Sequence, residues 1–231
     1  ALKDFKKKFK NKQFSSKNAQ LYRGIASFEP IIYYPSAPDT RKPRGGAAYL
    51  TLIAENAPTW KAYPKRLSSI LCTTSEKQAK KFADSGQYGE KNGSVYVVIP
   101  NDNALMGIVP AHDFNIPEPG SNFDMVSRFL KQLRENYDRA KDEWLDTDSW
   151  KNYVKQIKYF DDKAEIEDRF DLDSSYNYLL KRFVDGQWKT FYDFLIEVTA
   201  PEYLGFALKN YTKGFKAKKN GTDGIELFFS D

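Results

Sequence analysis

Three short segments, far apart in this chain, each place a polar side chain beside an apolar, strand-like run. They are residues 21–24 (LYRG), 69–75 (SILCTTS) and 224–229 (GIELFF), and they contribute an arginine, neighbouring hydroxyls and a glutamate. An arginine binds anionic oxygens bidentately and stays charged. A carboxylate stabilises the positive charge that develops when a bond at a sugar carbon breaks. Together these residue types predict a site that holds an anionic cofactor and cleaves such a bond.

Each segment needs a regular element to position its polar residue. Residues 20–26 and 225–229 have the apolar character of strands, and residues 69–73 have that of a buried strand. Ser75 can then cap a helix over 76–83, because its hydroxyl accepts a backbone N–H of the first turn. That helix is expected to bury one face, made of Ala79, Phe82 and Ala83.

The rest of the chain mixes strands and helices without regular alternation. A helix is expected over 47–56, and strands over 94–100, 105–109 and 203–208, whereas 35–46 is a loop rich in Pro and Gly. Apolar residues at helical spacing predict about three helices between residues 121 and 187, and 188–198 fits a helix or a strand. This order predicts an α+β fold in which residues 19–231 form one domain with a helical insertion at about 121–187.

Composition and charge separate a basic N-terminal segment from a nearly neutral body. The 231 residues are 41% hydrophobic, enough for a core, and carry a net charge of +5. Residues 1–18 contain seven lysines and one aspartate, a local charge of +6, so the remainder sums to −1. This segment indicates nucleic acid or an acidic surface as a partner, or else a solvated lysine face.

Membrane insertion and a disulfide are not expected. No apolar run is long enough to cross a bilayer, and the N-terminal residues lack the apolar stretch of a signal peptide. The single cysteine, Cys72, leaves no internal disulfide and fits a reducing compartment. The chain is therefore expected to be soluble and cytoplasmic.

Several common chemistries lack their residues. Neither GxGxxG nor GxxxxGK[ST] occurs, and one cysteine and one histidine do not suit a zinc site. His112, next to Asp113, fits either a catalytic base or a surface residue. The acidic run at 161–173 lacks the glycine and the final glutamate of a calcium-binding EF-hand loop, which favours a solvated acidic face.

Four motifs resemble those of the ADP-ribosyltransferase superfamily and follow one another in the same order along the chain. The resemblance is to the toxin-like and phage branch, which has an Arg–Ser–Glu motif set. Residues 22–24 (YRG) match the end of its first strand, and 73–75 (TTS) its hydroxyl motif, followed by AKKFA at 79–83. Residues 97–100 (VVIP) match a later strand, and Glu226 opens a final apolar strand. The resemblance covers about 20–120 and 190–231. It implies a split β-sheet core into which the helical block is inserted.

The resemblance implies a mono-ADP-ribosyltransferase of the phage or bacterial effector type. Such an effector is expected in the cytoplasm, which can be that of a host cell. Such an enzyme cleaves NAD at the nicotinamide–ribose bond and transfers ADP-ribose to a protein or nucleic-acid acceptor. It gives the catalytic roles to Glu226, Arg23 and Thr73. The residues that it implies for NAD binding are Arg23, Gly24, Thr73, Thr74, Ser75 and Tyr88.

Two departures from the family pattern leave the acceptor open. Thr73 replaces the usual first serine, and Gly224 stands where the family often has a glutamate or glutamine that engages the acceptor. Transfer to arginine, to another protein group or to nucleic acid, plain NAD hydrolysis and a degenerate fold all remain alternatives. Arg23, residues 73–75 and Glu226 could also be a surface residue, a helix cap and a solvent-facing residue. A non-catalytic protein that binds a partner through residues 1–18 and the helical block is the competing hypothesis.

Overall fold

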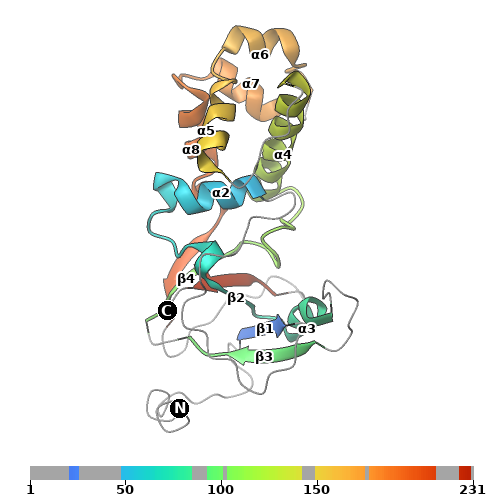
Figure 1. The fold of residues 1–231 in the computed structure, drawn as a ribbon, viewed down its shortest axis with the longest axis vertical. Coiled ribbons are helices and arrows are strands. Elements are labelled where there is room, and N and C mark those ends of the chain that lie inside the picture. Colours follow the sequence, from blue (N-terminus) through green and yellow to red (C-terminus); the bar gives the residue numbers. More distant parts are fainter. Residues whose placement is uncertain are drawn as a thin grey trace.

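The computed structural model describes residues 21–25, 48–84, 93–100, 103–141, 149–174, 177–211 and 224–229. Within these ranges the chain forms six strands and eight α-helices, which confirms the α+β class. Figure 1 shows most of the helices gathered in a lobe on one side of the sheet, with α2 (Ala48–Asn56) between the lobe and the strands. The basic segment 1–18 and the loop 35–46 lie outside the described residues.

The described strands form one antiparallel sheet in the order β3-β1-β2-β6-β4-β5. The resemblance, by contrast, implies a split sheet. Here the two halves are joined because β2 and β6 pair over four residues, from Ile70 opposite Phe229 to Thr73 opposite Glu226. The strands are β1 (Leu21–Ile25), β2 (Ile70–Thr73), β3 (Ser94–Val98), β4 (Leu105–Ile108), β5 (Ala207–Asn210) and β6 (Glu226–Phe229).

The two faces of the sheet bury different clusters, because successive side chains of a strand point to opposite faces. One face carries an apolar cluster whose members include Leu21, Cys72 and Leu227. On the other face, Phe228 is part of the large core that fills the helical lobe. Gly107 leaves room for this ring, since a Cβ on Gly107 would come within 2.3 Å of Phe228 Cζ. Residues of the same parity as Phe228 on β6 therefore face the helical lobe.

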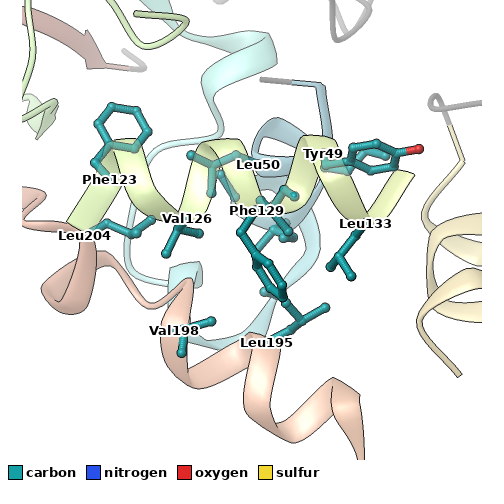
Figure 2. Close-up of a cluster of buried hydrophobic side chains, with 14 of the residues drawn as sticks. Tyr49, Leu50, Phe123, Val126, Phe129, Leu133, Leu195, Val198 and Leu204 are labelled. Carbon is teal, nitrogen blue, oxygen red and sulfur yellow. The ribbon is translucent and has the colours of Figure 1, made fainter. Parts of the chain in front are cut away.

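The helical lobe is built on the amphipathic helix α4 (Asn122–Lys141). Its buried residues recur at helical spacing and contact α2 on one side and α8 (Phe191–Val198) with α9 (Pro201–Leu204) on the other, as Figure 2 shows. The other helices of the lobe are α5 (Trp150–Lys158), α6 (Lys163–Arg169) and α7 (Tyr178–Asp185). In the described segments, no helix combines the length and the apolarity needed to span a bilayer.

The structure resolves one ambiguity and corrects two local expectations. The ambiguous stretch 188–198 contains a helix, α8, whose first turn is capped by Thr190. The strand expected over 203–208 begins only at Ala207, because α9 occupies 201–204 and ends at Gly205, which has a φ of 81°. Phe82 is exposed on α3 (Glu76–Asp84), and Gln78 is buried instead.

Candidate functional site

Thr73 and Glu226 lie directly opposite each other on neighbouring strands. Thr73 of β2 pairs in register with Glu226 of β6, and Tyr22 of β1 pairs with Thr73 from the other side. Opposed residues in an antiparallel pair point to the same face, with Cβ atoms about 4.5–5.5 Å apart. The sheet therefore brings the predicted hydroxyl and the predicted carboxylate together, on the face turned toward the helical lobe.

The Glu226 carboxylate is enclosed by Arg66 and the turn around Phe114, and the residue is only 5% exposed. Oε1 accepts hydrogen bonds from Arg66 Nη2 at 3.0 Å and Nε at 3.3 Å. Oε2 accepts one from the Phe114 backbone N–H at 2.9 Å. A carboxylate offers about four lone-pair positions, and three are used here. One acceptor position on Oε2 has no hydrogen bond among these contacts.

The electrostatics of this carboxylate are a balance between burial and pairing. Burial raises the pKa of Glu226, and the nearby Asp113 raises it as well. The Arg66 charge and the Phe114 N–H act in the opposite direction, because both favour the ionised form. The net shift of the pKa is upward, so desolvation is the larger effect. Cys72, on the opposite face of β2, also has a raised pKa because of burial and the neighbouring Glu226.

Arg66 comes from the short 3₁₀-helix η3 (Arg66–Ser68), just before β2. Its guanidinium carbon lies over the Phe114 ring, 4.3 Å from the ring centre, a cation–π contact that helps to hold the side chain in place. Glu55 of α2 holds the same turn, since its Oε1 accepts the Leu67 N–H at 2.8 Å. Arg66 was not among the residues predicted from the sequence. Its only sequence signal is a basic residue a few positions before a buried strand, which is common on surfaces.

The three hydroxyls of residues 73–75 have different uses. Thr73 Oγ1 accepts the Ser75 N–H at 3.2 Å, a bond that leaves the hydroxyl hydrogen of Thr73 available to donate. Thr74 Oγ1 accepts the Ile225 N–H at 3.0 Å, and Ser75 Oγ accepts the Gln78 N–H at 3.2 Å. Thr74 therefore ties β2 to β6, and Ser75 caps α3 as predicted. Of the three, Thr73 lies directly opposite Glu226, and these two residues form the cross-strand row Thr73–Glu226.

Gly224 has a structural reason to be glycine. Its φ is +77°, in the left-handed region that favours glycine. A Cβ there would also come within 2.7 Å of Ser75 Cβ and 2.9 Å of the Ser75 backbone nitrogen. The position two before Glu226 therefore cannot carry the acceptor-engaging side chain of the family without moving the turn after β2.

Arg23 points to the other face of the sheet. Its neighbours Tyr22 and Gly24 face α3: Glu76 of α3 raises the pKa of Tyr22, after the larger effect of burial, and a Cβ on Gly24 would collide with Ala79 O. Arg23 alternates with them and acts electrostatically on Cys72, in the cluster on the opposite face. The structure thus separates Arg23 from Thr73 and Glu226. Gly24 serves the close packing of α3 on β1.

Two other sequence candidates were Tyr88 and His112. Tyr88 lies outside the described residues. His112 Nδ1 is 3.6 Å from Glu118 Oε1, whereas Asp113 Oδ1 accepts from the Asn115 backbone N–H at 2.8 Å. Among the residues that the structure describes, no group of three or more His, Cys, Asp or Glu side chains is arranged to hold a metal ion.

The residues around Glu226 differ in how they match the two halves of NAD. The remaining acceptor position on Glu226 and the Thr73 hydroxyl match ribose hydroxyls in hydrogen-bonding chemistry, since those both donate and accept. Both residues are buried, Thr73 at 2% and Glu226 at 5% exposure. The diphosphate does not fit the expectation, because Arg23 lies on the wrong face. Arg66 is the cation on the right face, but it already binds Glu226. In hydrogen-bonding chemistry alone, Thr73 and Glu226 match the sugar half of NAD better than its diphosphate.

Comparisons of the chain with models of protein families, with curated proteins and with solved structures find no match.

Proposed function

We propose that this chain is an ADP-ribosyltransferase-like enzyme that cleaves NAD at the nicotinamide–ribose bond, with Glu226 as the catalytic carboxylate. The observation that carries the proposal is the register of β2 and β6, which sets Thr73 opposite Glu226. The order of the hydroxyl motif, the helix that Ser75 caps and the late strand opened by Glu226 adds support. The ADP-ribosyltransferase fold itself belongs to the same proposal, with the described strands joined in one sheet instead of a split core.

In this reaction the C1′–N bond breaks, and its electron pair leaves with nicotinamide, whose ring nitrogen loses its positive charge. Water or an acceptor group then forms a bond to C1′ and releases one proton. Positive charge spreads over C1′ and the ring oxygen in the transition state, as in glycoside hydrolysis. A fixed carboxylate in a water-poor site stabilises that charge strongly, because the interaction is weakly screened there.

Each residue of the row has one task in this proposal. Glu226 accepts a hydrogen bond from the ribose 2′-hydroxyl. It does so at the acceptor position on Oε2 that Arg66 and Phe114 leave unused. Thr73 donates its hydroxyl hydrogen to the ribose, because its oxygen is already engaged by Ser75 N–H. Gly224 leaves no side chain to select an acceptor, which favours water, or an acceptor bound by other parts of the chain.

The test is the release of nicotinamide from NAD by the full chain, followed by chromatography. The wild type is expected to release nicotinamide, and Glu226→Gln to lose nearly all of this activity. Glu118→Gln is the matched control, because Glu118 is an exposed carboxylate of the same type. Normal turnover by Glu226→Gln, or an equal loss in the control, contradicts the assignment of Glu226.

A second candidate is a non-catalytic interaction protein on the same scaffold. One observation favours it: Glu226 is 5% exposed and paired with Arg66, which is the environment of a structural ion pair. This candidate predicts no nicotinamide release. It also predicts a protein or nucleic-acid partner whose binding weakens steeply with salt and is lost when residues 1–18 are deleted.

A further inference from the structure

We propose that Arg66 is a positioning residue for the proposed reaction: through its ion pair it keeps the Glu226 carboxylate ionised and fixed in one orientation. This inference rests on the proposed function of Glu226. Arg66 enters the site from η3 rather than from a strand of the sheet, and it is separated from Glu226 by 160 residues.

The first support is geometric. The Arg66 side chain is 12% exposed and that of Glu226 is 6% exposed, so neither group is solvated as a free ion. Two guanidinium nitrogens bind the same oxygen, Oε1, while the Phe114 N–H binds Oε2. Because the Arg66 guanidinium also lies over the Phe114 ring, the residues that supply the donors contact each other. The carboxylate therefore has one defined plane, and its remaining acceptor position has one defined direction.

The second support is the charge around the carboxylate. Burial and Asp113 favour the protonated acid, which is useless for stabilising a positive transition state. Arg66 is the group that opposes them by charge, and the Phe114 N–H adds a hydrogen bond. The neighbouring ionisable groups are Glu55 on α2, next to the Arg66 turn, and Cys72 on β2, whose burial keeps it neutral. Removing Arg66 is therefore expected to push the pKa of Glu226 further upward.

The third support is that Arg23, predicted from the sequence, and Arg66, found in the structure, lie on different faces of the sheet. The arginine of the strand motif, Arg23, faces the cluster around Cys72 and cannot orient Glu226. Arg66 supplies a guanidinium on the correct face. A positioning role explains why this cation binds the carboxylate directly.

The experiment compares wild type, Arg66→Gln and Arg66→Lys in the full chain, with two readouts. The first is the titration of the Glu226 side-chain carboxyl, followed by ¹³C NMR and assigned with Glu226→Gln. The second is the pH profile of nicotinamide release. Arg66→Gln should raise the pKa of Glu226 and move the acid limb of the profile upward by the same amount. Its activity near neutral pH should fall about 100-fold, as for a misplaced catalytic group.

Arg66→Lys separates charge from orientation, because lysine keeps the charge but lacks the planar fork. It should hold the pKa of Glu226 near the wild-type value while nicotinamide release still falls. It also serves as the informative variant if Arg66→Gln does not fold. An unchanged Glu226 titration in Arg66→Gln overturns the inference, as does faster nicotinamide release, which would make Arg66 a barrier. If the wild type releases no nicotinamide at any pH, the proposed function fails, and the NMR titration still decides whether Arg66 controls Glu226.

Discussion

Replacing Arg66 with methionine should cost this protein a large part of its stability. The variant removes the guanidinium from Glu226 Oε1, where it makes contacts of 3.0 and 3.3 Å, and leaves the carboxylate with the Phe114 N–H alone. Both side chains of the pair are nearly inaccessible. Breaking a buried ion pair by removing one partner costs about 3–5 kcal/mol, because the remaining charge stays desolvated. We expect the Arg66→Met variant to lose this amount of unfolding free energy near neutral pH.

The assay is urea unfolding, with the free energy extrapolated to water. Lys131→Met is the matched control: its pair with Glu135 spans 3.9 Å, and both side chains are exposed. An exposed pair of this kind is worth at most about 1 kcal/mol. Combining Arg66→Met with Glu226→Gln should recover part of the loss, with a coupling energy of about 1–3 kcal/mol. A loss in Arg66→Met no larger than in the control would refute the buried pair.

Three further outcomes follow from single features. Gly224→Ala should destabilise the folded protein more than Gly120→Ala. Both glycines have a φ of +77°, which costs an L-residue about 1–2 kcal/mol, but of the two only Gly224 is crowded, by Ser75. Equal losses in urea unfolding would contradict the crowding. Tyr153→Phe should leave stability unchanged or raise it by about 1 kcal/mol, since the buried Tyr153 hydroxyl has no hydrogen-bond partner among the residues that the structure describes. A clear loss in the same assay would indicate a partner such as water. Burial raises the pKa of Glu226 above its ordinary value of 4.5, so the stabilising effect of its protonation is full below that pH and declines as the pH rises through the folded value. Glu226→Gln should remove this decline with rising pH, and an identical pH dependence in both proteins would argue against the shift.

The elements around the site were largely predictable because their signals are local. The Ser75 cap, helix α3 and the final strand depend on residues within a few positions of each other, and all three are confirmed. Strand β5 and helix α8 were less accessible from the sequence. The left-handed Gly205 that ends α9 delays the strand to Ala207, and the cap that starts α8 is a single threonine, Thr190.

The contacts that define the site were not predictable because they join distant residues. Whether Arg23 shares a face with Glu226 depends on the register of β1 against β2, which no local motif encodes. The bond from Arg66 to Glu226 spans 160 residues. The contact of Arg66 with the Phe114 ring depends on a turn that follows β4. Gly224 looked like a missing acceptor residue in the sequence. Its crowding against Ser75 becomes visible only when β2 and β6 are paired.

The proposal that Thr73 and Glu226 form one NAD-cleaving unit is tested most directly by a double-mutant cycle on nicotinamide release. The rates of wild type, Thr73→Val, Glu226→Gln and the double variant are measured with NAD alone. If the two opposed residues act on the same ribose, their effects are not additive, and the double variant is no slower than Glu226→Gln. Fully additive losses would contradict a shared site, and a wild type that releases no nicotinamide would contradict the activity itself.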